Sequence, residues 1–380
     1  MMFKIQRTIF LALLLFLPGC SVVHYMNEVS IVRTGIASGI PAATIPCVEV
    51  PSSNQLEMTI RLEIASEVAN ALAAGDFKTL EDYYSLYRQR TSRTPGGRWK
   101  LQMFYAGTDF DHPDNKKDIA AFEAQLLQWM QAYPQSPASH IAYSRFLLDR
   151  AWQFRGGGYA REVPREAWAP FYKNVELARV HLQQTREFAS ADPQWYVSMF
   201  KVAQAESWSR LEVKKLLREA LSKEPYYQET YQAVFDNLSP KWGGSYQEAE
   251  TFADDAVTIT SQCEGQGMYT RIYWRAIDSN TDFIDNPFGS SRVSWEKMKL
   301  GFEDIIARYP SAWNINNFAR FACLAGDQET TRRLINQIGD KPILEAWTQK
   351  TTFADCQAWA SQSSQIAKHI SPFDLARYER

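Results

Sequence analysis

Residues 224–253 read EPYYQETYQAVFDNLSPKWGGSYQEAETFA, and the prediction of the fold starts from this stretch. Its first half repeats apolar side chains at helical spacing, and residues 240–244 end that helix with Pro and Gly. Ser245, followed three residues later by Glu248, predicts a capping box at the start of a second helix. Neither helix can bury its apolar stripe alone, so units of this kind are expected to stack.

Similar turns recur near both ends of the chain. Ala-Gly-Asp interrupts a helical pattern at residues 74–76 and again at 325–327, and Gly accepts the left-handed conformation at a helix end. Pro193 and Pro225 lie 32 residues apart, close to the 34 residues of a tetratricopeptide unit. No strand-like alternation persists after Val50. We therefore predict an all-α body, a tetratricopeptide-like solenoid of stacked hairpins, over residues 56–380.

Residues 278–292 form a possible boundary within that body. The segment contains Asp-Asn-Pro-Phe-Gly-Ser-Ser at 285–291, which is typical of a loop. It either separates two subdomains or connects neighbouring hairpins of one array. The second interpretation is favoured, because the same kind of helical unit precedes and follows the segment.

The first residues predict export and a lipid anchor. Lys4 and Arg7 precede an apolar run at 9–17, which suits a secretory signal and is too short to span a membrane. The run ends in Leu-Pro-Gly-Cys at 17–20, which resembles the lipobox of bacterial lipoproteins. This resemblance implies removal of residues 1–19 and lipidation of Cys20. The alternative is a plain signal peptide with an incidental cysteine. Residues 20–55, where Gly and Pro recur without a helical period, are predicted to be a flexible tether.

Several phrases resemble one bacterial family. They are LLDRAWQFRGGGY at 147–159, DPQWY at 192–196, PKWGG at 240–244 and Tyr-Trp at 273–274. Members of this uncharacterised family have tetratricopeptide-like helices, and the resemblance covers roughly residues 60–275. It implies the fold, and it implies no activity.

Composition and motifs argue against several classes of function. The chain is 45% hydrophobic and 22% charged with a net charge of −2, an ordinary globular balance without the basic patch that binds nucleic acid. It lacks a nucleophile elbow, a phosphate loop and a His-Glu-x-x-His motif. His112, among three aspartates, is the best metal-binding guess, although an exposed acidic turn is favoured. We therefore predict no enzyme activity, no cofactor and no metal.

A glycine run provides the candidate binding site. Residues 156–158 are three glycines, interpreted either as a wide turn or as a flexible loop over a groove. In the second interpretation Arg155, Tyr159 and Arg161 bind an anion or a peptide terminus. The rings of Trp152 and Trp242 are further candidates, since aromatic side chains either pack hairpins together or contact a peptide or a sugar.

Four cysteines remain after Cys20, and export places them where disulfides persist. Cys323 and Cys356 are 33 residues apart, about one repeat, so they are expected on neighbouring helices. A Cys47–Cys263 bridge is the weaker second hypothesis. The alternative for each pair is buried free thiols, which helical cores often contain.

Two functions remain open from the sequence. The first is an envelope-anchored lipoprotein that binds a protein or peptide partner. The second is a glycan-directed cell-wall protein, either a binder or a lytic enzyme. Ser21 after Cys20 implies the periplasmic face of the outer membrane, if the host has two membranes.

Overall fold

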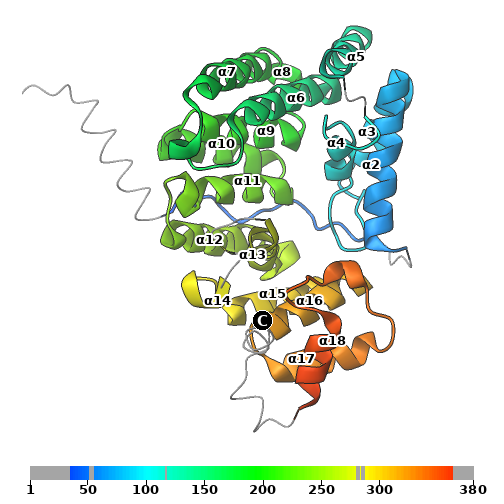
Figure 1. Ribbon diagram of the computed structural model, residues 1–380, viewed down its shortest axis with the longest axis vertical. Coiled ribbons are helices and arrows are strands. Elements are labelled where there is room, and N and C mark those ends of the chain that lie inside the picture. Colours follow the sequence, from blue (N-terminus) through cyan, green and yellow to red (C-terminus); the bar gives the residue numbers. More distant parts are fainter. Residues whose placement is uncertain (1–34, 51–54, 116–117, 280–282, 284–286, 363–380) are drawn as a thin grey trace, which may run out of the picture.

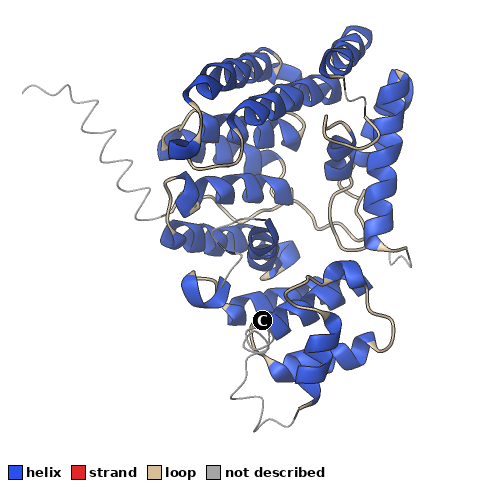
Figure 2. Cartoon of the chain, in the orientation of Figure 1, coloured by secondary structure: helices blue, strands red, loops and turns tan. Residues whose placement is uncertain are grey.

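The computed structural model describes residues 35–50, 55–115, 118–279, 283 and 287–362. The predicted signal peptide and Cys20 lie outside these residues. Within them the chain forms helices, turns and two isolated β-bridges but no β-strand (Figure 2). The all-α prediction is therefore confirmed. None of the helices in these ranges has both the length and the apolar character needed to cross a membrane.

The helices follow one another through short connections. The N-terminal ones are α2 (Glu57–Ala74), α3 (Phe77–Tyr87), α4 (Leu101–Gly107) and α5 (Ile119–Ala132). Next come α6 (Pro137–Arg155), α7 (Trp168–Gln184), α8 (Arg186–Ala189), α9 (Pro193–Ala205), α10 (Arg210–Lys223), α11 (Gln228–Leu238), α12 (Tyr246–Glu264) and α13 (Gly267–Ser279). The C-terminal ones are α14 (Pro287–Ser290), α15 (Trp295–Arg308), α16 (Ala312–Leu324), α17 (Gln328–Ile338) and α18 (Phe353–Ser361). Single 3-10 turns are η1 (Ala160–Glu162), η2 (Arg165–Ala167), η3 (Pro240–Trp242) and η4 (Leu344–Ala346).

Helices α9 to α15 stack as pairs (Figure 1). α9 packs on α11 and α11 packs on α13, while each of the three also packs on the next long helix, α10, α12 or α15. The predicted hairpin is therefore present as α11 and α12. Its cap differs in one detail. Ser245 accepts a hydrogen bond from Glu248 N, but the Glu248 carboxylate bonds to the Ser245 hydroxyl and to Arg210 rather than to the Ser245 backbone N–H.

The segment at 278–292 does not interrupt the packing. α13 and α15, on either side of it, are in close contact. Thr270 Oγ1 donates to Met298 O at 2.8 Å, and a side-chain carbon added at Gly301 would lie 2.6 Å from Gln266 O. These contacts favour a connection within one array over a boundary between subdomains.

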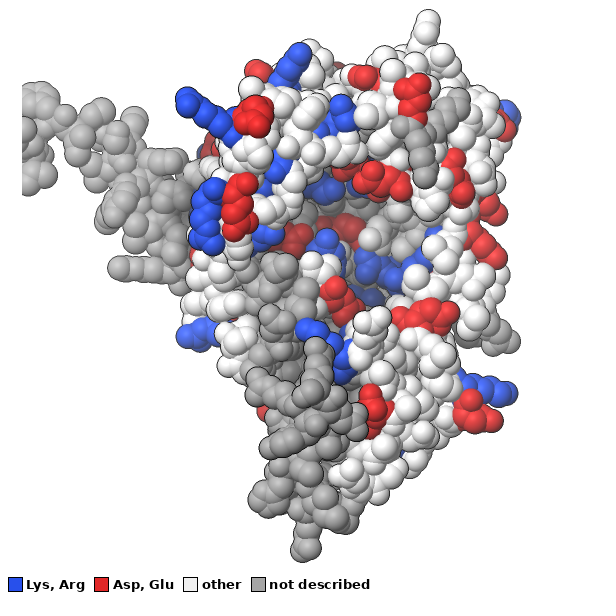
Figure 3. All heavy atoms as spheres, viewed as in Figure 1, with Lys and Arg blue, Asp and Glu red and all other residues white. Residues whose placement is uncertain are grey.

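Helices α2, α3 and α4 form a layer to one side of this stack (Figure 1). α2 and α4 approach so closely that a side-chain carbon at Gly107 would lie 2.4 Å from Ala65 O. The face drawn in Figure 3 is hollowed between this layer and the stacked helices, and Lys and Arg side chains lie in the hollow together with Asp and Glu side chains. The N-terminal layer therefore encloses space against the stack instead of extending it.

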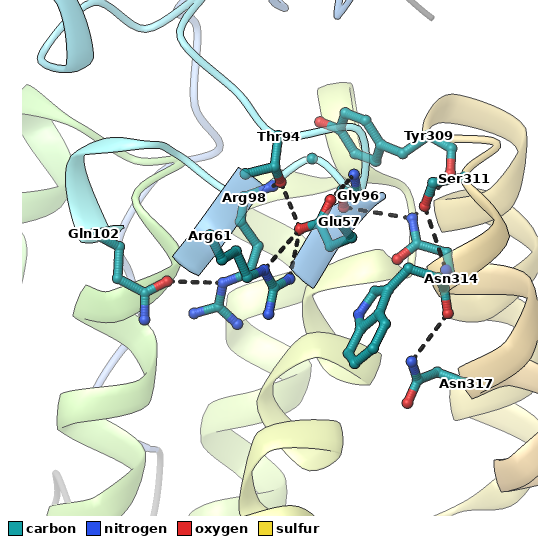
Figure 4. Close-up of polar contacts among 12 residues, drawn as sticks. Glu57, Arg61, Thr94, Gly96, Arg98, Gln102, Tyr309, Ser311, Asn314 and Asn317 are labelled. Carbon is teal, nitrogen blue, oxygen red and sulfur yellow. Dashed lines mark hydrogen bonds and ion pairs between the residues drawn. The ribbon is translucent and has the colours of Figure 1, made fainter. Parts of the chain in front are cut away.

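Residues 88–100, here called the bridging loop, connect α3 to α4 and contact α13 and α16 (Figure 4). The Gly96 carbonyl accepts hydrogen bonds from Arg271 of α13 and Asn314 of α16, at 3.1 and 3.4 Å. Gly97 has a φ of +85°, and a side-chain carbon there would lie within 2.8 Å of Tyr309 and Arg271. Only glycine fits this conformation and this spacing.

Residues 35–50 are a strap along α12, and the prediction of a flexible tether over 20–55 is wrong for them. Ile36 and Ala37 are buried, and Ala43 N donates to Ile259 O at 2.8 Å. Val48 O accepts from Arg308 at the end of α15. Apolar side chains among the Gly and Pro residues account for the difference, because they can bury surface without a helical period.

Both cysteine pairings suggested by the sequence are present. Cys47 of the strap is bonded to Cys263 of α12, with a Cα–Cα distance of 5.3 Å. Cys323 of α16 is bonded to Cys356 of α18, with a Cα–Cα distance of 5.9 Å. The first bridge fixes the strap to the body, and the second fixes the last described helix.

A pair of histidines links α6 to α7. Pro134 O accepts from His140 Nε2, so His140 Nδ1 is left to accept the proton of His181 Nε2 at 3.0 Å. Burial lowers the pKa of His140. Burial and the neighbouring His140 lower the pKa of His181 from 6.5 to about 4. The folded protein therefore holds both rings neutral.

This pair predicts a loss of stability in acid. Between pH 6.5 and about 4 the unfolded chain binds more protons than the folded one, so the free energy of unfolding falls as the pH falls. With allowance for solvent screening, wild type should lose about 2 kcal/mol more than His181→Gln across this window. Denaturant unfolding of both proteins at several pH values measures the difference, because other ionisations cancel. Parallel pH profiles would contradict it.

Candidate functional site

Four of the five predicted binding residues line one pocket of about 590 Å³. Trp152 and Arg155 come from the end of α6, Tyr159 from the turn after it, and Trp242 from η3. The other walls come from the start of α7 and from the connection between α9 and α10. We call this cavity the aromatic pocket. It lies where the ends of successive helical hairpins meet.

Arg155 sits in a box of aromatic rings. Its Cζ lies 5.1 Å from the ring centroid of Trp152, 5.3 Å from those of Trp168 and Trp242, and 6.0 Å from that of Phe171. Only 7% of the residue is exposed. Cation–π attraction accounts for the stacking, because each ring face carries partial negative charge.

The Arg155 charge has no acidic partner among the described residues. Nη1 donates to the carbonyls of Gly156 and Gly158 at 3.0 and 3.1 Å, while Nε and Nη2 have no acceptor in the same part of the chain. Burial lowers the pKa of Arg155. A buried cation without a carboxylate is costly. The arrangement is thus suited to an anion supplied from outside.

The glycine loop forms one wall of the pocket. Gly156 has φ 70° and ψ 178°, a conformation that is essentially limited to glycine. Arg155, the last residue of α6, donates to Gly158 O of the loop. Lys241 of η3 donates through Nζ to Gly157 O, at 2.9 Å. The run is therefore a turn after α6, and its last glycine, Gly158, lines the pocket.

The remaining lining is cationic and aromatic. Arg210 and Lys241 add two cations, and the described lining residues include no Asp or Glu. Arg210 is paired with Glu248 at 3.1 Å. Four more rings line the space, those of Trp168, Phe171, Tyr172 and Trp208. The pocket therefore offers positive charge and apolar ring faces together.

Some neutral polar groups in the pocket are engaged within the protein, whereas others, such as the Gln204 amide, have no described side-chain partner. Asn237 Nδ2 already donates to Phe200 O and Ala233 O. The Ser209 hydroxyl caps α10 through Glu212. Ser207, which also lines the pocket, has a φ of +54°, unusual for a residue other than glycine.

Arg161 does not line the pocket, so its prediction as a binding residue is not supported by the geometry. Its side chain is 80% exposed and lies 3.7 Å from Glu162. The guanidinium stacks over Tyr159 at 5.2 Å, on the outside of the loop.

Sequence reasoning missed Trp168, Arg210 and Lys241 as site residues. Trp168 and Arg210 are the first residues of α7 and α10, and Lys241 lies within η3. A usable signal existed, because Trp and Arg side chains gather at helix ends that stacking would bring together. Lys241 stands directly before Trp242, which the sequence did single out.

His112 lies in a turn, and its contacts do not resemble those of a metal centre. Its Nδ1 accepts from Asp114 N at 3.3 Å and lies 3.8 Å from the Asp114 carboxylate. In the described part of the chain, no group of three or more His, Cys, Asp or Glu side chains is placed to hold a metal ion.

No family model matches this chain, and neither a curated protein nor a solved structure matches it. The resemblance to an uncharacterised helical family therefore stays an expectation from the sequence. What the aromatic pocket can bind follows from its own chemistry.

Proposed function

We propose that this chain is an envelope-anchored lipoprotein with a tetratricopeptide-like body, and that its aromatic pocket binds the carboxyl-terminal end of a peptide. The lipobox at Cys20 supports the anchor. The paired stacking of α9 to α15 supports the relationship to tetratricopeptide arrays. The pocket supports the ligand class.

The charge of the pocket carries the proposal. Arg155, Arg210 and Lys241 line it, and its described lining contains no carboxylate. Arg210 is paired with Glu248 outside the lining, whereas Arg155 has no acidic partner among the described residues. An incoming carboxylate would meet the unused Nε and Nη2 donors of Arg155. Charge-assisted hydrogen bonds of this kind are about twice as strong as neutral ones.

The ring content favours a peptide end over a sugar. Apolar faces suit an aromatic or aliphatic last residue, whereas a sugar needs partners for its hydroxyl groups. Asn237 Nδ2 and the Ser209 hydroxyl are engaged elsewhere, which leaves the Gln204 amide as the side-chain amide in the lining with no described partner. The glycan-directed alternative is thus less well supported by this pocket.

Catalysis is no part of the proposal. A lytic enzyme needs two carboxyl groups roughly 5 to 10 Å apart in one cleft. The described lining of the aromatic pocket provides none. A binding role needs only the charge and the rings.

A matched set of small probes tests the proposal. N-acetylphenylalanine carries the terminal carboxylate and a ring, and N-acetylphenylalaninamide lacks only the charge. We expect calorimetry to show the acid binding at least about tenfold more tightly than the amide, the effect of one charge-assisted contact. N-acetylmuramic acid represents a wall sugar with a carboxylate and should bind more weakly than N-acetylphenylalanine. Tighter binding of the sugar would favour the glycan-directed alternative instead.

A further inference from the structure

A second cavity, of about 650 Å³, lies between the N-terminal layer and the stack, in the hollow seen in Figure 3. Four arginines from separate parts of the chain line it. Arg61 comes from α2, Arg98 from the bridging loop, and Arg271 and Arg275 from α13. We call it the arginine cavity. None of these four residues lines the aromatic pocket.

The arginines are close enough to repel one another. Figure 4 shows the guanidinium groups of Arg61 and Arg98 side by side. Burial, and next the charge of Arg98, lowers the pKa of Arg61 to about 10, against the opposing effect of Glu57. An additional negative charge in this space would relieve that repulsion.

Several donors in the cavity wall are not used. Arg98 donates through Nε to Gln102 and through Nη2 to Glu229, so its Nη1 is the nitrogen without an acceptor among the described residues. Arg271 is 5% exposed, and its Nε makes no hydrogen bond to the described residues but lies 3.8 Å from the Glu264 carboxylate. Trp313 Nε1 is also buried without an acceptor there. Buried N–H groups without a hydrogen bond are rare in proteins, and both of these are closed off from water.

The carboxylates in and around the cavity leave some guanidinium donors unused. Two acids line it, Asp114 and Asp278, against the four arginines. Asp278 is already bonded by both oxygens to Arg320, at 2.9 and 3.0 Å. Each of the four arginines also has one carboxylate outside the lining, and each of these occupies only part of a guanidinium: Glu57 for Arg61, Glu229 for Arg98, Glu264 for Arg271 and Asp236 for Arg275.

Apolar surface completes the lining. Trp274 and Trp313 face the space together with Leu62 and Met103. A cavity of this volume holds a small organic molecule rather than a bare ion.

We propose that the arginine cavity binds a small organic oxyanion, a carboxylate or phosphate on a flat apolar body, independently of the aromatic pocket. The oxyanion accepts from the guanidinium groups, including Arg98 Nη1, which has no acceptor among the described residues. The body packs against the two tryptophan rings. The chain then has two anion sites of different size and exposure.

Calorimetry on the full chain with phenyl phosphate and with benzoate tests this proposal and identifies which oxyanion is preferred. At least one of the probes should bind, and Arg275→Gln should weaken its affinity about tenfold. Arg275 suits the test because its side chain is 40% exposed, so the variant should fold. Arg333→Gln, at an exposed ion pair between α17 and α15, is the matched control and should bind normally.

Two further outcomes decide the matter. Arg155→Gln should leave unchanged the part of probe binding that Arg275→Gln weakens, which separates this site from the aromatic pocket, where these ring-bearing anions can also bind. The proposal is overturned if neither probe binds at concentrations up to about 10 mM, which would reveal even a millimolar Kd. Equal loss of affinity in Arg275→Gln and Arg333→Gln would overturn it as well.

Discussion

Replacing Glu57 by glutamine should destabilise the protein by about 3 kcal/mol. The Glu57 side chain is completely buried, and it accepts from Arg61, from Thr94 Oγ1 and from Gly96 N at 2.6 to 2.8 Å (Figure 4). Glutamine keeps the shape but removes the charge, so the Arg61 cation loses its carboxylate. The substitution also weakens the attachment of the bridging loop to α2.

Denaturant unfolding of Glu57→Gln beside Glu303→Gln measures the effect. Glu303 is 41% exposed and pairs with Arg333, so its substitution should change the free energy of unfolding by less than about 1 kcal/mol. Limited proteolysis should cut the bridging loop faster in the Glu57 variant. Equal stabilities of the two variants would show that Glu57 does not hold this loop.

Replacing Cys20 by alanine should abolish membrane attachment. Several acyl chains on one residue give lasting attachment, since burial contributes roughly 0.8 kcal/mol per CH₂. Without the cysteine the precursor should stay unprocessed or leave the membrane fraction. Fractionation after a salt wash, with Cys47→Ala as a control that keeps the lipobox, measures this. A cleaved Cys20→Ala protein that still sediments with the outer membrane would contradict the anchor.

The strap limits how far the body can lie from such an anchor. Between Cys20 and Gly35, the first described residue, a fully extended chain spans at most about 50 Å. A free tether to residue 55 would more than double that reach. The Cys47–Cys263 bridge therefore keeps the body near the membrane surface, if Cys20 is lipidated.

Local signals in the sequence were sufficient for the individual helices. Both Ala-Gly-Asp turns form as predicted, with Gly75 and Gly326 at positive φ and with Asp76 and Asp327 capping the next helix. Asp192 caps α9, and Pro193 occupies its first turn. These features depend on neighbours within a few residues, which a single sequence contains.

Features that depend on distant partners were not predictable. Gly96 contacts Arg271 and Asn314, which are far away in the sequence, and no periodicity marks the bridging loop. The strap was interpreted as a tether for the same reason. The arginine cavity also has no local pattern, because its four cations come from three separate segments.

The aromatic pocket was predictable in part, because some of its residues are close in sequence and others are not. Trp152, Arg155 and Tyr159 are close in sequence, so the glycine run was enough to group them. The burial of Arg155 among rings depends on Trp168 and Trp242, which only the packing of three hairpins brings together. Arg161, by contrast, was grouped by proximity alone, and the chain carries it outside.

The most direct test of the central claim is the affinity ratio of N-acetylphenylalanine to N-acetylphenylalaninamide, compared between wild type and Arg155→Gln. If Arg155 recognises the carboxylate, the variant should lose about tenfold or more in affinity for the acid and stay within about twofold for the amide. Lys241→Gln should show a smaller loss in the same direction, and Lys78→Gln, at a surface pair on α3, should show none. An acid-to-amide ratio that is the same in wild type and Arg155→Gln would contradict the account.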